Sequence, residues 1–105
     1  MQPGRIAFIA AILCGACAVP AQAETIHVTM EKMGFIPAQV NAKVGDTIEW
    51  TNKDFLQHSA TAADKSWDVV LPQNKTGHIV VKAPGTIDYI CKYHPNMKGK
   101  ITVAP

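Results

Sequence analysis

The chain has 105 residues, with ten Lys and Arg against eight Asp and Glu and a formal net charge of +2. This length predicts a single domain, and the near-balance of charge argues against a nucleic-acid binder, which normally carries a clear basic excess. With 48% apolar and 17% charged residues, the composition argues against a disordered tail and predicts a folded domain.

The first 23 residues have the pattern of a secretory signal peptide. The basic residue Arg5 precedes an apolar run over residues 6–19, and an A-x-A cleavage motif ends at Ala23. This run of 14 residues is shorter than the ~20 that a membrane-spanning helix needs, and an uncleaved anchor is the alternative. We therefore predict a cleaved leader over residues 1–23, a mature domain over residues 24–105, a periplasmic location and no stable membrane insertion.

Cleavage leaves a single cysteine, Cys91, because Cys14 and Cys17 both lie in the leader. The mature chain therefore has no second thiol with which to form an internal disulfide. A lone thiol is unusual in an exported protein, since exported compartments are oxidising. Either Cys91 is buried and inert, or it pairs with another chain, or its sulfur is occupied by something else.

Apolar and polar residues alternate with a period of two in short runs of the mature sequence, and no stretch shows sustained helical periodicity. In chain order the runs lie at residues 26–30, 40–44, 48–50, 67–71, 79–81, 87–89 and 101–103. Turn signals separate them, for example Gly45-Asp46 and Pro84-Gly85. Short strands with regular turns predict an all-β fold, either an antiparallel sandwich or a small barrel.

A cluster of metal-ligating residue types follows the strand predicted at residues 87–89. Cys91, His94 and Met97 occur at intervals of three, so a tight loop can direct all three side chains to one point. His58, at the start of another predicted strand, supplies a second imidazole. One thiolate, two imidazoles and a weak thioether are the ligands of a type 1 copper site. Zinc is the competing ion, but Met is not a usual zinc ligand.

Each of these residues alone has an ordinary explanation. A lone strand His is usually a surface or hydrogen-bonded residue, a lone loop Met usually packs, and a single buried Cys is usually inert. Their combination in an exported all-β chain with no other thiol favours a metal site over these separate explanations.

Four stretches of the mature chain resemble cupredoxins, in particular plastocyanins and amicyanins. They lie at residues 35–40, 44–52, 85–91 and 97–103. The spacing Cys-x2-His-x2-Met, with Pro95 directly after the His, is similar to that of amicyanins. The resemblance covers essentially all of the mature part, and it implies a small antiparallel Greek-key β-sandwich.

The resemblance also implies one copper ion, held by three equatorial ligands and one axial ligand: His58, Cys91 and His94 with Met97. We therefore predict a periplasmic type 1 (blue) copper protein that is not an enzyme. It is expected to transfer single electrons, as a monomer, between redox partners such as a periplasmic dehydrogenase and a c-type cytochrome. The alternatives are a copper carrier or chaperone with the same ligands and a zinc-stabilised structural module.

Two departures from the family pattern lie next to the predicted ligands. Ser59 stands where the family usually has an Asn that helps to tie the two ligand loops together. Lys92 and Tyr93 stand where amicyanins carry Thr-Pro between the Cys and the His.

Overall fold

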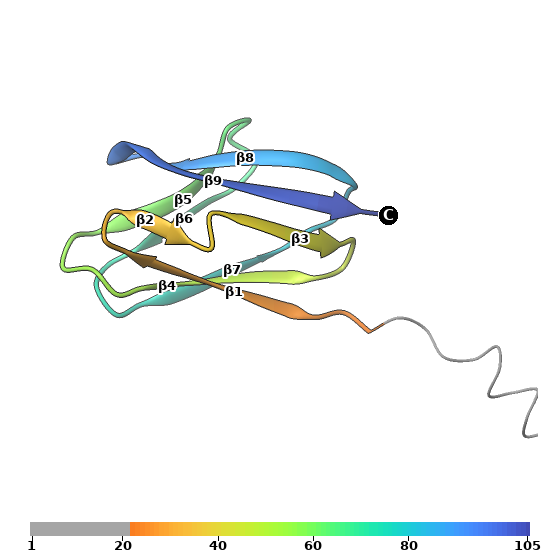
Figure 1. Cartoon of the computed structure of the whole chain (residues 1–105), viewed down its shortest axis with the longest axis horizontal. Coiled ribbons are helices and arrows are strands. Elements are labelled where there is room, and N and C mark those ends of the chain that lie inside the picture. The colour runs from red at the N-terminus through yellow and green to blue at the C-terminus, as the bar shows by residue number, and fades with distance from the viewer. Residues whose placement is uncertain (1–21) are drawn as a thin grey trace, which may run out of the picture.

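The computed structural model of the chain describes residues 22–105. All regular secondary structure in that range is β-strand (Figure 1). The strands are β1 (Thr25–Glu31), β2 (Gly34–Ile36), β3 (Gln39–Lys43), β4 (Thr47–Asn52), β5 (His58–Ala62), β6 (Asp68–Leu71), β7 (Thr76–Val80), β8 (Gly85–Cys91) and β9 (His94–Ala104). The predicted leader lies outside the described residues except for its last two positions. Between residues 22 and 105, no helix is long and apolar enough to cross a membrane.

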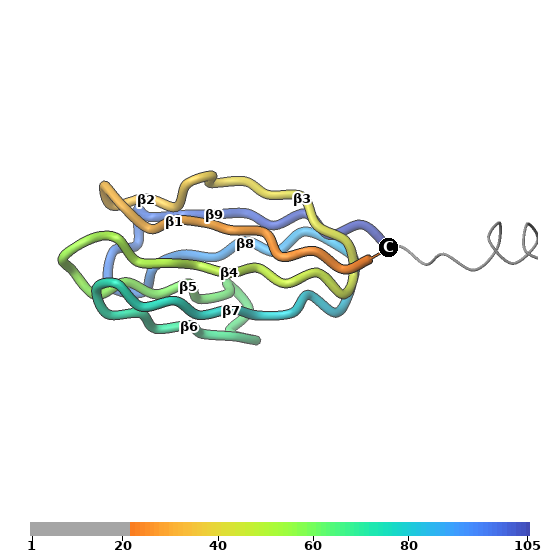
Figure 2. The backbone as a smooth tube through the Cα atoms, turned by 90° about the horizontal axis from the view of Figure 1, so that it is seen from below, coloured from red at the N-terminus to blue at the C-terminus, as the bar shows by residue number. Residues whose placement is uncertain are grey.

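The strands form two sheets that pack face to face as a sandwich. One sheet has the strand order β2-β1-β4-β7, and the other has the order β3-β9-β8-β5-β6. Figure 2 shows that the strands of both layers run along the same long direction. The prediction of an all-β sandwich is confirmed.

The sheets are mixed rather than purely antiparallel, which corrects one detail of the sequence prediction. In the described range, β1 pairs with β4 and β3 pairs with β9 in parallel, whereas the other five pairings are antiparallel. β2 and β3 run in the same direction, so β4 returns in the direction of β1 (Figure 1). Side chains alternate in the same way in both kinds of pairing, so the sequence pattern does not encode strand direction.

The core lies between the sheets and consists of the inward-facing residues of the alternating runs. On β1, Val28 and Met30 are at most 1% exposed, and on β4 Ile48 and Trp50 are fully buried. Burial of each such side chain stabilises the fold by about 1.5–3 kcal/mol. The predicted period-two pattern therefore supplies the apolar surface that holds the two layers together.

An aromatic cluster joins the sheets close to the strand end that carries Cys91. The Nε1 group of the buried Trp50 donates a hydrogen bond to the Tyr89 hydroxyl at 3.1 Å, and the ring centroids of Phe35 and Tyr89 are 4.6 Å apart. Burial raises the pKa of Tyr89 to about 12, although the hydrogen bond from Trp50 lowers it, so the phenol stays neutral. The Tyr89 ring lies over Gly99, its partner on β9, where a side chain would overlap it.

Two strands differ in extent from the sequence prediction. β2 corresponds to none of the predicted runs, because it has only three residues and begins at a glycine, Gly34. β9 begins at His94 rather than near residue 101. The strand that starts at His58 is present as β5, and all five of its residues are buried. β5 lies between β6 and β8 in the five-stranded sheet, which places His58 beside the end of β8.

Candidate metal centre

Three potential ligand atoms converge at one end of the sandwich. Cys91 Sγ lies 3.5 Å from His94 Nδ1 and 3.8 Å from His58 Nδ1, and the two Nδ1 atoms are 3.2 Å apart. Donors that share one metal ion at about 2.0–2.3 Å lie roughly 3–4 Å from one another. The spacing of these three atoms therefore fits a single bound metal ion.

The backbone register explains why Cys91 and His94 meet. Cys91 is the last residue of β8 and His94 is the first residue of β9, and the two residues are partners across a turn formed by Lys92 and Tyr93. Residues opposite each other in a hairpin place their side chains within reach of one another. A two-residue turn thus brings the thiol and the imidazole together, as the sequence spacing predicted.

The carboxylate of Asp54 sets the tautomer of the fully buried His58. His58 Nε2 lies 2.7 Å from Asp54 Oδ2, and an ionised carboxylate only accepts hydrogen bonds. In the neutral imidazole the proton is therefore on Nε2, which leaves Nδ1 as the nitrogen that can bind a metal. Burial raises the pKa of Asp54, but hydrogen bonds from His58 and from the amides of Met33 and Lys32 outweigh it, so the net shift is downward.

Sequence reasoning missed Asp54, which lies in the segment between β4 and β5. The one signal in the sequence is a carboxylate four residues before a candidate ligand. Buried metal-binding histidines commonly donate their second N–H to a carboxylate, which fixes the ring orientation. This pairing supports a ligand role for His58 more strongly than burial alone does.

Cys91 is fully buried and has a hydrogen-bond donor directed at its sulfur. The amide of Ser59 lies 3.4 Å from Cys91 Sγ. A donor of this kind compensates negative charge on a thiolate that is cut off from water. Full burial disfavours pairing of Cys91 with another chain, and the two imidazoles beside its sulfur make a metal ion a candidate occupant.

Met97 is buried close to this cluster, on β9. His94 pairs with Cys91 and Lys98 pairs with Ile90, so residues 95–97 have no partner on β8. This bulge re-aims the chain locally, and Met97 is only 2% exposed. Met97 and His94 line the same surface hollow.

The two departures from the family pattern connect the ligand loops. The amide of Lys92 donates to Ser59 Oγ at 2.9 Å, and Gln57 Nε2 donates to the Tyr93 hydroxyl at 2.9 Å. Gln57 and Ser59 flank His58, while Lys92 and Tyr93 separate Cys91 from His94. The two loops are therefore tied together on both sides of His58, through the turn that separates Cys91 from His94.

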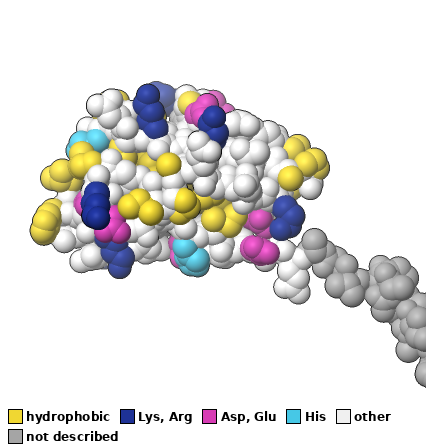
Figure 3. Space-filling model, viewed as in Figure 1, with side chains coloured by type: hydrophobic (Ala, Val, Ile, Leu, Met, Phe, Trp, Pro, Cys, Tyr) yellow, Lys and Arg dark blue, Asp and Glu magenta, His cyan; other side chains and the backbone are white. Residues whose placement is uncertain are grey.

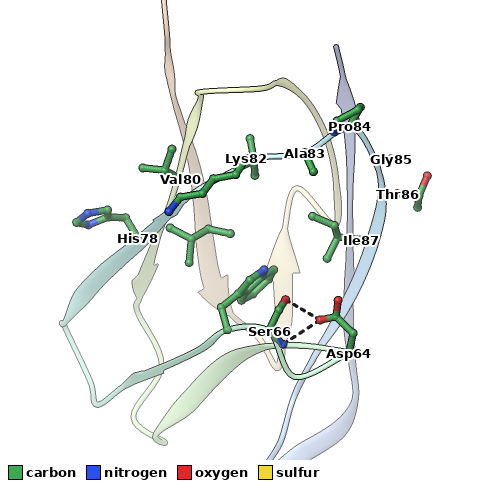
Figure 4. A pocket seen from close by; sticks show the side chains of 13 residues that line it. Asp64, Ser66, His78, Val80, Lys82, Ala83, Pro84, Gly85, Thr86 and Ile87 are labelled. Atoms are coloured by element: carbon green, nitrogen blue, oxygen red, sulfur yellow. Dashed lines mark hydrogen bonds between the residues drawn. The ribbon is translucent and has the colours of Figure 1, made fainter.

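A larger hollow of the described region lies away from these ligands. Asp64 and Ser66 lie on one side of it, and Val80 and Lys82 lie on the opposite side (Figure 4). Its lining includes none of the candidate ligand residues. The geometry of the donor atoms, rather than the size of a hollow, therefore locates the candidate metal centre.

The family model of the cupredoxin-like domain matches residues 4–103. The chain belongs to this family. This cupredoxin is 38% identical over 89 residues to amicyanin-alpha of Methylorubrum extorquens, with 79% of this chain and 75% of that protein covered. It is 30% identical over 87 residues to the amicyanin of Paracoccus versutus, with 77% of this chain and 66% of that protein covered.

Solved structures agree with the sequence relatives. A Cu(I) structure of an amicyanin variant matches this cupredoxin with a TM-score of 0.72 at 26% identity, covering 76% of this chain and 82% of that chain. A second Cu(I) amicyanin variant matches with a TM-score of 0.71 at 28% identity, and the match covers 85% of this chain and 89% of that chain. The predicted resemblance to cupredoxins of the amicyanin type is confirmed, and the cluster of His58, Cys91 and His94 is a candidate copper site.

Proposed function

We propose that this cupredoxin is a type 1 copper protein that carries single electrons between redox partners and catalyses no reaction of its own. His58, Cys91 and His94 would hold the ion, with Met97 as a weak fourth ligand. The observation that carries the proposal is the convergence of one thiol and two imidazole nitrogens within 4.8 Å of one another. A soft thiolate and thioether combined with imidazoles suit copper. Copper supplies a one-electron couple between Cu(I) and Cu(II).

The protein's own residues keep the ligand atoms in place. His58 is held by Asp54, and Cys91 and His94 are held by the β8–β9 hairpin. Ligands fixed by strands and hydrogen bonds move little when the charge of the site changes. A small rearrangement is what rapid electron transfer requires.

The two histidines differ in their access to solvent. His58 is fully buried, whereas His94 is only partly buried. We infer that electrons enter and leave near His94. Hydrophobic side chains gather at this end of the molecule (Figure 3). The exposed apolar residues near the ligand loops are Met33 (44%), Phe55 (87%), Leu56 (52%) and Tyr93 (44%), and together we call them the apolar patch.

An apolar patch of this kind suits weak, transient docking. Lys32 precedes Met33 of the patch, and Lys98 follows Met97; both lysines are exposed. Lys92 is less available to a partner, because its Nζ already pairs with Asp68 Oδ2 at 2.7 Å. Two exposed lysines beside the patch favour a partner with an acidic docking surface.

We further propose a periplasmic location, with residues 1–23 as a cleaved leader and residues 24–105 as the mature domain. The support is the basic start, apolar run and A-x-A motif of the sequence. A dehydrogenase and a c-type cytochrome of that compartment are the kinds of donor and acceptor we expect.

The visible spectrum of the mature domain loaded with Cu(II) tests the proposal. A thiolate bound to Cu(II) gives an intense charge-transfer band, and the band should bleach and return on reduction and reoxidation. A copper carrier would instead hold Cu(I) and release it readily to a chelator, without a stable coloured form. A structural zinc module would prefer Zn²⁺ and would show neither colour nor redox cycling, and either result would overturn the proposal.

A further inference from the structure

A closed network of hydrogen bonds links the two ligand loops on the side of β5 away from the core. The Lys92 amide donates to Ser59 Oγ at 2.9 Å, and Ser59 Oγ lies 2.7 Å from Thr61 Oγ1. Thr61 Oγ1 donates to Asp68 Oδ1 at 2.8 Å, and Lys92 Nζ donates to Asp68 Oδ2 at 2.7 Å. We call these four residues the Asp68 network. It begins and ends at Lys92, the residue after Cys91.

The direction of every hydrogen bond in the network follows from its donors and acceptors. The Asp68 carboxylate only accepts, because its hydrogen bonds to Lys92 and Thr61 hold its pKa below the ordinary value. Thr61 has one hydroxyl proton and gives it to Asp68, so Ser59 must donate to Thr61. Ser59 then has only lone pairs left for the Lys92 amide. The protons therefore all point one way, from the Lys92 amide towards Asp68.

The inner part of the network is cut off from water. Ser59 is fully buried and Thr61 is 7% exposed, so each hydroxyl depends on its neighbour for a partner. Hydrogen bonds in such a chain polarise one another, and the loss of one member weakens the rest. The outer part is different, because the side chains of Lys92 and Asp68 are 40% and 42% exposed.

The network is attached directly to the candidate ligands. Ser59 follows His58 on β5, and its amide also donates to Cys91 Sγ at 3.4 Å. Lys92 follows Cys91 and begins the two-residue turn to His94. A change in the Ser59–Lys92 contact therefore changes the separation of the two loops that carry the ligands: His58, Cys91 and His94.

We propose that Asp68, acting through Thr61 and Ser59, is a positioning residue that holds the turn after Cys91 against the strand of His58. This inference rests on the proposed function, because it concerns how the ligands of the proposed copper site are held in place. The simpler explanation is a surface ion pair between Lys92 and Asp68, which contributes little to stability and nothing to the site. The two explanations differ in what happens to the buried hydroxyls when Asp68 is changed.

Amide hydrogen exchange in the metal-free protein is the first measurement. In Asp68→Ala, Thr61 loses its acceptor, and exchange of the Lys92 amide should accelerate by about tenfold. Thr61→Val keeps the shape of the side chain but interrupts the network, and it should give a similar acceleration. The matched control is Glu49→Gln, which removes the negative charge from the pair of His27 and Glu49 and should change this exchange rate less than about twofold.

The second measurement is the spectrum and reduction potential of the copper-loaded variants. Asp68→Ala and Thr61→Val should both shift the charge-transfer band and the potential in the same direction, and the double variant should shift them no further. Unchanged exchange at Lys92, or a shift equal to that of Glu49→Gln, would overturn the positioning role. If the unaltered protein shows no charge-transfer band, the proposed function fails, while the exchange measurement still tests the network.

Discussion

Asp54 Oδ2 accepts a hydrogen bond from His58 Nε2 at 2.7 Å, and Asp54 also accepts the amides of Lys32 and Met33 at 3.0 and 3.2 Å. One carboxylate thus joins the turn between β1 and β2 to the first candidate ligand. Its effect on His58 is chemical as well as mechanical, because a proton held on Nε2 leaves Nδ1 as the nitrogen that can bind a metal.

Replacing Asp54 should therefore weaken metal binding. In Asp54→Leu the Nε2 group of His58 is buried without a partner, and copper affinity should fall by about 10–100-fold. In Asp54→Asn the side-chain oxygen can still accept from Nε2, so the loss should be smaller. Competition titration with a chelator measures both variants. Asp64→Asn is the control, because the Asp64 side chain accepts hydrogen bonds from Ser66 within its own turn. A loss of equal size in that variant would contradict the role of Asp54.

Removal of Cys91 and removal of Met97, two of the four proposed ligands, should have different effects on the copper site. Cys91→Ser should abolish the charge-transfer band, since that band arises from the thiolate. Met97→Leu should retain the band and alter the reduction potential, because the thioether is a weak ligand. Absorption spectra and voltammetry of the two copper-loaded variants make the comparison. An unchanged band in Cys91→Ser would remove Cys91 from the site.

Gly99 should tolerate no side chain while Tyr89 is present. An added Cβ would overlap the Tyr89 ring, so Gly99→Ala should lower the free energy of unfolding by about 1–3 kcal/mol. Urea unfolding of the metal-free protein measures the loss. In a Tyr89→Leu background the same change should cost much less, and equal costs in both backgrounds would show that the ring is not the obstacle.

Acid should destabilise the protein partly through Asp46. This carboxylate accepts the amides of Glu24 at 2.9 Å and Lys43 at 2.8 Å, and these hydrogen bonds lower its pKa in the folded state. Because the folded pKa lies below the unfolded value of about 3.9, the contribution of Asp46 is complete above that value. It is lost as the pH falls through the folded pKa.

Urea unfolding at a series of pH values from 6 to 3 tests this linkage. In Asp46→Asn the free energy of unfolding should be lower at pH 6, and it should fall less steeply below pH 5 than in the unaltered protein. Asp64 and Asp68 also have lowered pKa values, so some acid dependence should remain. Parallel curves for the two proteins would contradict the assignment to Asp46.

The sequence predicts the sandwich and the candidate ligands for different reasons. The alternation at residues 26–30 and 48–50 identifies buried faces, as the burial of Val28 and Trp50 shows. Cys91 and His94 are close in sequence, so a hairpin turn suffices to bring them together. His58 is distant in sequence, and no local pattern places it beside Cys91 and His94; only the need of the site for a second imidazole indicates it.

Features that depend on the approach of separate segments could not be predicted in this way. Asp54 acts on His58 and on the turn between β1 and β2 at once, and neither contact has a local sequence pattern. Ser59 differs from the family's Asn, yet its hydroxyl still accepts the Lys92 amide because Thr61 and Asp68 orient it. The parallel pairing of β3 with β9 likewise depends on the path of the chain between the sheets.

The last prediction concerns docking at the apolar patch. If an acidic partner approaches beside Lys32 and Lys98, electron transfer should slow as salt is added, because salt screens exposed charges. Lys32→Glu and Lys98→Glu should lower the rate at low salt and flatten its salt dependence, while Phe55→Ser should lower the rate at every salt concentration. None of these changes should alter the absorption spectrum, since the three residues lie on the surface and outside the ligand set.

Stopped-flow reduction of an acidic c-type cytochrome by the copper(I) protein measures these rates. Lys82→Glu is the matched control, because it makes the same change of charge at the larger hollow, away from the ligands. That variant should retain the rate and salt dependence of the unaltered protein. If it slows transfer as much as Lys98→Glu does, net charge rather than the patch beside His94 governs the encounter. A rate that stays constant from low to high salt would exclude a role for the lysines.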